Sequence, residues 1–197
     1  MSPPRRILLI EGHPDPSAER LNRALVDAYA DGASAAGHEV RRIVVGAIDF
    51  PLLRTAEAWN HGALPPTLQP AQDGMAWAEH VVIFFPLWLG DMPALLKAFL
   101  EQVARPGFAV GPEGPKPFGH KPLSGRSARV VVTMGMPALA YRWYFRAHSV
   151  KSLERNILGF VGFGPIHETL IGSVEGLGSE GVSRWLKKMH KLGEQAA

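Results

Sequence analysis

The chain has 197 residues, of which 46% are hydrophobic and 20% are charged, and it carries a formal net charge of +3 and no cysteine. This composition is typical of a soluble globular protein and excludes disulfide scaffolds, thiol catalysis and thiolate metal sites. Lysine and arginine occur in no run longer than a pair, which disfavours nucleic acid as a partner and favours a small anionic ligand. Because a chain without cysteine suits a reducing compartment, we expect a cytoplasmic location.

The most apolar region of the sequence, Val81 to Leu100, is not expected to enter a membrane. Pro86, Asp91, Pro93 and Lys97 interrupt it, whereas a membrane-spanning helix needs about 20 mostly apolar residues. No internal repeat, low-complexity stretch or linker divides the chain. We therefore expect a single domain that covers residues 1–197.

Taken in chain order, strand-like and helix-like patterns alternate. Apolar runs typical of strands buried on both faces occupy residues 7–10, 81–85, 130–133 and 169–171, and a further strand is predicted at 40–45. Patterns with a period near 3.6 predict helices over residues 18–36, 69–78, 94–103, 152–161 and 181–192. This alternation predicts an α/β fold with an open parallel sheet of five strands and helices on both faces.

The first predicted strand ends in Gly12-His13-Pro14-Asp15-Pro16-Ser17, directly before a predicted helix. A helix start offers unpaired backbone N–H groups and the positive end of the helix dipole, which together bind phosphate. Alternatively, Ser17 or Asp15 only caps the helix and His13 has no special role. The spacing alone gives these two interpretations equal weight.

The third and fourth predicted strands also end in distinctive loops. Phe85-Pro86-Leu87-Trp88 leads to Pro93, a residue tolerated at a helix start, and Thr133-Met134-Gly135 is followed by Tyr141. Each loop has an ordinary structural interpretation as well, since Trp88 can cover the edge of the core and Gly135 can form a turn. In a sheet of order 2-1-3-4-5, however, the ends of strands one, three and four are neighbours at the point where a flavin mononucleotide binds.

Two long loops and one glycine-rich motif complete the pattern. Loops as long as those predicted at 50–66 and 106–125 are often functional in compact domains. Residues 176–181, Gly-Leu-Gly-Ser-Glu-Gly, match G-x-G-x-x-G, but no later strand follows in this sequence to carry the ribose-binding acid of a dinucleotide fold. We interpret this motif as a flexible turn into the last helix.

Five stretches of the sequence, in order, resemble one protein family. They are HPDP…LNRAL after the first strand, FPLW…MPALLKAFLEQV, GFAVG at 107–111, TMG…Y at 133–141 and NILGFVGFGPI at 156–166. In these stretches the chain resembles the flavodoxin-like NAD(P)H:quinone oxidoreductases, a family that includes DT-diaphorase, the bacterial drug-activity modulator and the ancillary reductases of potassium-efflux systems. The second stretch is the most specific, and the resemblance covers nearly the whole chain.

The resemblance implies a fold, a cofactor and a reaction. The fold is flavodoxin-like, with strand order 2-1-3-4-5, and the cofactor is FMN or FAD, bound non-covalently in a homodimer. The reaction is a two-electron, ping-pong transfer of hydride from NAD(P)H through the flavin to a quinone-like acceptor. A different class of function remains open, namely a flavodoxin-like electron carrier or a regulatory subunit of a transporter, although the basic charge of the chain disfavours a flavodoxin carrier.

The resemblance also assigns expected roles to individual residues. In the anion loop and the following helix, the expected flavin-binding residues are His13, Ser17, Arg20, Leu21 and Asn22. Along the flavin ring and at its pyrimidine end they are Pro86, Leu87, Trp88, Leu89, Gly90, Thr133, Met134, Gly135 and Met136. Tyr141 and His148 match a tyrosine and a histidine that stabilise charge near flavin N1 and O2. No metal site is expected.

The sequence departs from the family at several of these positions. Glu19 and Arg20 stand where a serine is usual, so that Ser17 is expected to supply the hydroxyl and Arg20 a charge. Leu89 and Gly90 replace aromatic residues that commonly form the wall of the substrate pocket, and Met136 replaces the second glycine of a Gly-Gly pair. These changes bear on the choice of acceptor and on catalytic efficiency rather than on the fold.

Overall fold

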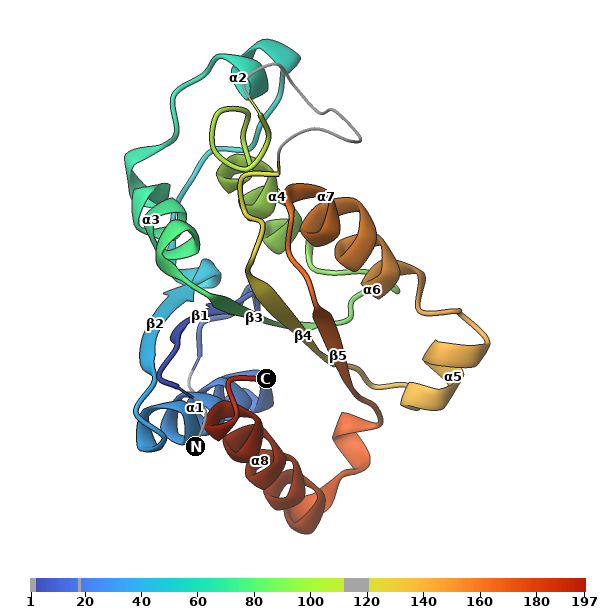
Figure 1. The fold of residues 1–197 in the computed structure, drawn as a ribbon. Helices are drawn as coiled ribbons and strands as arrows, with labels where there is room; N and C mark the ends of the chain where they lie inside the picture. Colours follow the sequence, from blue (N-terminus) through green and yellow to red (C-terminus); the bar gives the residue numbers. More distant parts are fainter. Residues whose placement is uncertain (1–2, 18, 112–120) are drawn as a thin grey trace.

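The computed structural model describes residues 3–17, 19–111 and 121–197 (Figure 1). Its strands are β1 (Arg6–Glu11), β2 (Glu39–Val44), β3 (His80–Pro86), β4 (Ser127–Thr133) and β5 (Ile166–Ile171). They form one parallel sheet in the order β2-β1-β3-β4-β5. The predicted fold class and the predicted strand order are therefore confirmed.

Helices cover both faces of this sheet. In the described ranges they are α1 (Leu21–Ala35), α2 (Ala56–Asn60), α3 (Gln69–Trp77), α4 (Ala94–Val103), α5 (Ala138–Trp143), α6 (His148–Ser152), α7 (Gly159–Val161) and α8 (Gly178–Glu194). A π-helical stretch, Leu153–Leu158, joins α6 to α7, and Val174–Gly176 forms a short 3-10 turn before α8. Figure 1 shows α1 and α8 on one side of the sheet and α3, α4, α6 and α7 on the other.

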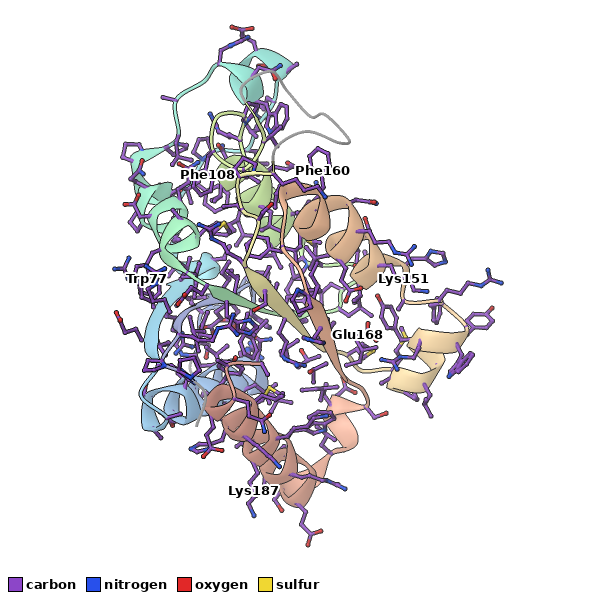
Figure 2. The ribbon with its side chains drawn as sticks, in the orientation of Figure 1. Trp77, Phe108, Lys151, Phe160, Glu168 and Lys187 are labelled. Carbon is purple, nitrogen blue, oxygen red and sulfur yellow. The ribbon has the colours of Figure 1, made fainter. Side chains whose placement is uncertain are left out.

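The hydrophobic core is split by the sheet into two layers. Along β3, Val81 and Ile83 pack under α3 and α4, whereas Val82 and Phe84 pack against α1 and α8, because successive side chains of a strand point to opposite faces. Every residue of β3 is buried, as expected for a central strand of a parallel sheet. Side chains fill the space between the sheet and its helices, while Lys187 lies on the outer side of α8 (Figure 2).

Close packing of α1 against α8 depends on two glycines. A Cβ atom at Gly32 would lie 2.0 Å from the carbonyl oxygen of His190, and one at Gly193 would lie 2.1 Å from that of Tyr29. No side chain fits at either position, so the two helix backbones approach more closely than any other residue would allow. This packing fixes α1, whose first turn begins at the carboxyl edge of the sheet.

The structure corrects several of the predicted boundaries. The helix predicted from residue 18 begins at Leu21, and residue 18 itself lies outside the described residues. The loop predicted at 50–66 contains α2, whose start is capped by the Thr55 side chain accepting a hydrogen bond from the Ala58 N–H at 3.0 Å. The helix α5 was not predicted, since its six residues are too few to show a helical period.

Two further segments bear on earlier expectations. The predicted helix over 152–161 is the second part of a longer helical run from α6 to α7 that changes to π geometry in its middle. Residues 112–120 of the long loop predicted at 106–125 lie outside the described residues. None of the helices in the described ranges is at once long and apolar enough to cross a membrane.

Candidate functional site

The carboxyl ends of β1, β3 and β4 meet at one edge of the sheet and border a cavity of about 430 Å³. The residues lining it are His13, Asp15, Arg20, Leu21, Asn22, Pro86, Trp88, Thr133, Val174 and Glu175. The structure thus brings together residues from all three loops that the sequence pointed to. Open parallel sheets bind ligands at this edge, where the strand order reverses between β1 and β3.

The loop after β1 is closed by Asp15 rather than by Ser17. The Asp15 carboxylate accepts hydrogen bonds from the Ser17 N–H at 2.9 Å and from Arg20 Nε and Nη2 at 2.8 and 2.5 Å. The Arg20 guanidinium, with the Ser17 N–H second, holds the pKa of Asp15 below its usual value. His13 lies inside this loop, where its Nδ1 accepts the Asp15 N–H at 3.0 Å.

The start of α1 has no side-chain cap. Arg20 occupies the N-cap position and makes no capping hydrogen bond, and no acidic residue lies in the first turn. The alternative in which Ser17 or Asp15 only caps this helix is therefore not what the structure shows. The first turn of α1 contributes Leu21 and Asn22 to the cavity lining, and among the described residues no side chain caps this helix start. An uncapped helix start is an arrangement that can bind an anion.

Asn22, in the first turn of α1, is a buried polar residue of this cavity. Its side chain is 3% exposed, and neither its Oδ1 nor its Nδ2 has a hydrogen-bond partner among the described residues. A buried polar group without a partner costs about 1 to 3 kcal/mol. Since Asn22 lines the cavity together with His13 and the uncapped helix start, these residues fit the phosphate end of a bound nucleotide.

Below the loop, Glu11 anchors the end of β1 to the surrounding elements. Its carboxylate is 1% exposed and accepts hydrogen bonds from Arg23 at 2.8 Å and from Arg42 at 2.6 Å. Arg23 belongs to α1 and Arg42 to β2, so the buried carboxylate connects three elements at the floor of the loop. A paired buried charge of this kind holds structure in place, and removing one partner would leave the other charge unpaired.

The segment after β3 forms a tight turn beside the cavity. Trp88 and Asp91 exchange two backbone hydrogen bonds of 2.9 and 3.0 Å, and the two residues between them, Leu89 and Gly90, have φ angles of 49° and 81°. Positive φ at both central positions is the geometry of a type I′ turn, and it costs a non-glycine residue about 1 to 2 kcal/mol. Trp88 presents its ring edge-on to His13, with 5.7 Å between ring centroids.

This turn separates the cavity from a second one. Leu89, fully exposed, lines a space of about 480 Å³ on the other side of the turn, together with Trp88, Asp91, Met92, Pro93, Ala94, Lys97, Ser152 and Ile157. Leu87 is half-buried against the core, and its N–H donates to the Thr133 carbonyl at 2.8 Å. Of the predicted ring-binding residues, Pro86 and Trp88 thus line the first cavity, and Leu87, Leu89 and Gly90 do not.

The glycine turn after β4 is fixed by the segment that follows β5. Met134 is buried and its N–H donates to the Ile171 carbonyl at 2.9 Å, which continues the strand pairing. Gly135 is exposed, Met136 is half-buried, and within the described residues neither N–H meets an acceptor. Thr133 lines the cavity directly, whereas the next three residues of the chain, Met134, Gly135 and Met136, are not among its lining residues.

Tyr141 and His148 lie away from this cavity. The Tyr141 side chain is 2% exposed, its hydroxyl accepts the Val150 N–H at 3.4 Å, and burial raises its pKa. His148 is exposed at the start of α6, and neither residue lines the cavity. The backbone between them passes through Arg146 and Ala147, both left-handed at φ 54° and 49°, which turns the chain sharply after α5.

Sequence reasoning missed two residues of the cavity, Val174 and Glu175, and considered a third, Asp15, only as a possible helix cap. Val174 and Glu175 belong to the short turn after β5, which ends at the same edge of the sheet as the other strands. The rule that ligands bind at the carboxyl ends of parallel strands applies to this strand too and could have found them. The G-x-G-x-x-G match at residues 176–181 instead directed the prediction to the start of the last helix, not to the end of β5.

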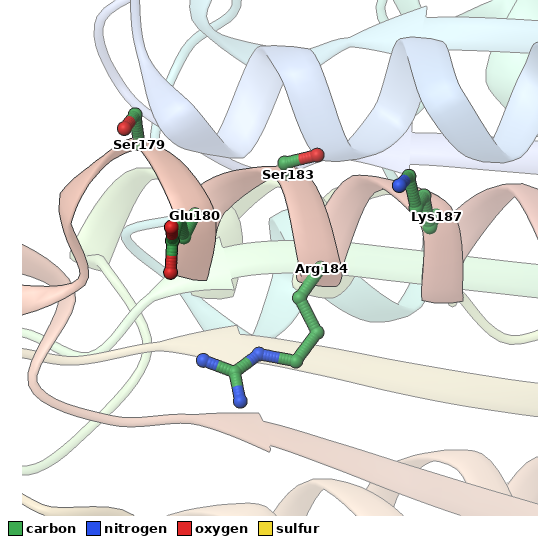
Figure 3. Close-up of a pocket in the computed structure, with 5 residues that line it drawn as sticks. All are labelled: Ser179, Glu180, Ser183, Arg184 and Lys187. Carbon is green, nitrogen blue, oxygen red and sulfur yellow. The ribbon is translucent and has the colours of Figure 1, made fainter.

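A separate hollow of about 570 Å³ lies on α8 and is lined by Ser179, Glu180, Ser183, Arg184 and Lys187 (Figure 3). All five residues come from one helix, and Figure 3 shows the Arg184 side chain extending away from it. The predicted turn at residues 176–181 begins as a 3-10 turn and enters α8 at Gly178, which has a φ of 59°. A single helix face without a buried polar group is not a formed ligand site.

The fold and the cavity at its carboxyl edge define a class of protein. The chain belongs to the family of flavodoxin-like fold proteins, whose sequence model matches residues 5–192. This finding confirms the family resemblance that the loop motifs indicated.

Two curated relatives show which members of this class the chain is similar to. The ribosyldihydronicotinamide dehydrogenase-like protein traD of Penicillium crustosum is 29% identical over 155 residues, which make up 66% of this chain and 57% of that protein. The glutathione-regulated potassium-efflux system ancillary protein KefG of Shigella dysenteriae is 30% identical over 146 residues, or 73% of this chain and 65% of KefG. The matches thus span less than two thirds of the length of either relative.

Solved structures agree on the fold. The NAD(P)H:quinone oxidoreductase from Methanothermobacter marburgensis superimposes with a TM-score of 0.82 at 18% identity, covering 98% of this chain and 97% of that one. An FMN-dependent NADH-azoreductase from Bacillus anthracis, solved in complex with FMN, gives a TM-score of 0.73 at 15% identity, covering 98% and 99%. At these identities the likeness shows a shared fold.

Proposed function

We propose that the chain is a flavin-dependent NAD(P)H oxidoreductase that passes hydride from NAD(P)H through a bound flavin to a quinone-like acceptor. The observation that carries this proposal is the buried Asn22 amide, which has no partner among the described residues and lines a cavity at the switch point of a flavodoxin-like sheet. The names of the relatives and of the structural neighbours support it: they include a quinone oxidoreductase, an azoreductase and a dehydrogenase-like protein.

The phosphate end of the flavin would be held at the start of α1. Asn22 and the uncapped N–H groups of the first helical turn donate hydrogen bonds, and the helix dipole adds a favourable field. His13 lines the same wall of the cavity. Arg20 is already paired with Asp15, so it neutralises that carboxylate and keeps it from repelling the phosphate.

The ring of the flavin would lie along the segment after β3. Pro86 and Trp88 offer an apolar and an aromatic surface. The N–H groups of Gly135 and Met136, which meet no acceptor among the described residues, suit the carbonyl oxygens at the pyrimidine end. A bound flavin supplies the hydride chemistry, and the protein supplies position and electrostatics. Backbone N–H groups that point to where negative charge develops stabilise it without reorganisation. NAD(P)H and the acceptor would use the exposed face of the ring in turn.

Tyr141 and His148 complete the proposal as residues that stabilise charge near flavin N1 and O2. Their role rests on the family resemblance, because the Tyr141 hydroxyl is bonded to the Val150 N–H and His148 is exposed outside the cavity. Ser17, Leu87, Leu89 and Gly90 are proposed on the same ground. In the structure the Ser17 N–H donates to Asp15, and the Ser17 hydroxyl accepts the Glu19 N–H at 3.4 Å.

The active form is proposed to be a cytoplasmic homodimer. Large apolar side chains are exposed on and just after α5, namely Leu139, Trp143, Tyr144 and Phe145, with exposed fractions between 47% and 82%. Exposed clusters of this kind mark interaction surfaces. The same cluster favours a second candidate function, regulation of a partner protein, since one relative is named as an ancillary protein of a potassium-efflux system.

Flavin titration followed by steady-state kinetics tests the proposal. We expect purified protein to bind FMN or FAD with quenching of the flavin and of Trp88, and then to oxidise NADH or NADPH with a quinone as acceptor. Binding of neither flavin would refute the cofactor. Flavin binding without NAD(P)H oxidation would favour the carrier or the regulatory role, and light scattering with flavin present would separate a dimer from a monomer.

A further inference from the structure

The Glu175 carboxylate lines the proposed flavin cavity. None of the contacts proposed above for the flavin phosphate or the flavin ring involves this carboxylate. Glu175 lies in the 3-10 turn after β5 and lines the cavity with Asn22 and Thr133. A Cβ atom built on Gly135 would lie 3.8 Å from Glu175 Oε1, so the carboxylate is in contact range of the glycine turn. None of the ion pairs among the described residues involves Glu175.

The backbone around Glu175 is fixed to the turn after β4. The Ser173 N–H donates to the Met136 carbonyl at 3.0 Å, and the Val174 N–H donates to the Met134 carbonyl at 3.2 Å. A Cβ at Gly172 would lie 2.2 Å from the Ala138 nitrogen, so only glycine allows the two segments to approach this closely. Ser173 adopts a left-handed φ of 52°, a conformation that persists where the surroundings enforce it. The fold thus holds the backbone of Glu175 beside the glycine turn, and the Glu175 side chain is exposed.

Hydrogen-bond donors of the glycine turn therefore lie near an acceptor, the Glu175 carboxylate, which lines the cavity. The N–H groups of Gly135 and Met136 are donors without a partner among the described residues, and the Glu175 carboxylate is an acceptor only. A ligand that satisfies all three must present acceptors to the N–H groups and a donor to the carboxylate. A phosphate fails this requirement, because it offers no donor and would be repelled.

We propose that Glu175 accepts the imide N–H of the flavin pyrimidine ring, while the N–H groups of Gly135 and Met136 donate to its carbonyl oxygens. The imide edge of a flavin carries one donor between two acceptors, which complements two donors and one acceptor on the protein. This inference rests on the proposed flavin function and adds a specific contact to it. A hydrogen bond to a charged acceptor is stronger than one between neutral groups, so Glu175 contributes to flavin affinity.

The test compares two flavins on three proteins. Equilibrium binding, followed by flavin fluorescence quenching, is measured for FMN and for N3-methyl FMN, in which the imide donor is replaced by a methyl group. The proteins are the unmodified chain, Glu175→Ala and Glu180→Ala. Glu180 is the matched control, because it is an exposed carboxylate five residues further along, outside this cavity.

We expect Glu175→Ala to bind FMN about ten- to a hundredfold more weakly than the unmodified chain, as for loss of a charged hydrogen bond. N3-methylation should weaken binding to the unmodified chain to a similar degree and have little further effect on Glu175→Ala, since both changes remove the same contact. Glu180→Ala should bind both flavins like the unmodified chain.

Three outcomes would overturn the inference. Unchanged FMN affinity in Glu175→Ala would show that the carboxylate makes no contact with the flavin. Equal weakening of FMN and N3-methyl FMN by Glu175→Ala would place the contact on another donor, such as a hydroxyl of the ribityl chain. Failure of the unmodified chain to bind either FMN or FAD would refute the proposed function and the inference together, whereas the first two outcomes leave the proposed function intact.

Discussion

Two polar side chains at opposite edges of the sheet, Arg5 and Asn22, differ in their hydrogen bonding. At the amino edge, Arg5 donates to the Ala196 carbonyl, the Glu79 carbonyl and the Ser127 hydroxyl at 3.1, 3.2 and 2.9 Å. Ser127 in turn lies 2.8 Å from His80 Nδ1. At the carboxyl edge, the buried Asn22 amide makes no hydrogen bond among the described residues.

This difference separates groups that are hydrogen-bonded within the fold from the group that we propose binds the flavin phosphate. His80 and Arg129 at the amino edge each leave one buried nitrogen without a partner, but each also has a hydrogen bond to a side chain of the next strand. Asn22 has both of its polar atoms unpaired. A buried amide that makes no contact lowers the stability of the free protein, and such a cost is typical of a binding site.

The largest effect on stability is expected from removing the Arg5 side chain at the amino edge of the sheet. Arg5→Ala removes the three hydrogen bonds of Arg5 and leaves their acceptors without this donor, so we expect the free energy of unfolding to fall by about 3 kcal/mol. Flavin affinity of the folded protein should not change, because Arg5 lies at the opposite edge from the cavity. Chemical denaturation and flavin titration of the same variant measure the two quantities. A variant with intact stability but weakened flavin binding would contradict the division between the edges.

A pH titration sharpens the same comparison. Burial, with the charges of Arg5 and Arg129 next, lowers the pKa of His80 to about 3, from 6.5 in the unfolded chain. Protonation therefore favours unfolding, and the contribution of neutral His80 is full above pH 6.5 and is lost as the pH falls toward 3. At pH 4.5 this loss is on the order of 2 to 3 kcal/mol.

His80→Gln provides the control for this titration, since glutamine keeps polar atoms at this position without a proton to gain. Unfolding free energies of the two proteins are compared between pH 4.5 and pH 7.5. As the pH falls, the unmodified protein should lose more unfolding free energy than His80→Gln does. Parallel pH curves would show that His80 is not the group that titrates.

The opposite response is expected at the carboxyl edge. Asn22→Leu replaces a buried amide that lacks partners with an apolar side chain of similar size, so the flavin-free protein should gain about 1 to 2 kcal/mol of stability. The same variant should lose flavin affinity, because leucine cannot donate to the phosphate. Denaturation without flavin and titration with flavin give the two measurements. A loss of stability on this substitution would mean that Asn22 serves the fold.

The sheet could be predicted from the sequence because its signals are local. Apolar runs that alternate with helical periods define the strands, and the strand order follows from the family motifs in the loops. The loops after β1, β3 and β4 were found because each carries an unusual residue type, such as His13, Trp88 or Gly135. Glu175 has no such signal, since its position depends on the approach of Gly172 to the segment after β4, which is a long-range contact.

The position of the Tyr141 side chain could not be predicted from the sequence either. Its spacing from Gly135 matches the family, but spacing does not tell which way a side chain points after a strand end. The left-handed residues Arg146 and Ala147 bring α6 back so that the Val150 N–H meets the Tyr141 hydroxyl. Neither residue is a glycine, so nothing in the sequence predicts this turn.

The smallest effect is expected from Tyr141→Phe. This variant tests whether the Tyr141 hydroxyl serves the stability of the fold or the reduction of the flavin. The variant keeps the buried ring and removes a hydroxyl that accepts one hydrogen bond of 3.4 Å, so stability should fall by only about 0.5 to 1 kcal/mol. Flavin should still bind. If Tyr141 stabilises the reduced flavin as proposed, flavin reduction by NAD(P)H becomes slower in the variant. The activation free energy should rise by less than the ~3 kcal/mol that one oxyanion donor supplies, because backbone N–H groups also stabilise the charge. Stopped-flow measurement at saturating NAD(P)H decides between the two roles: an unchanged rate with lowered stability places the Tyr141 hydroxyl among the groups that serve the fold.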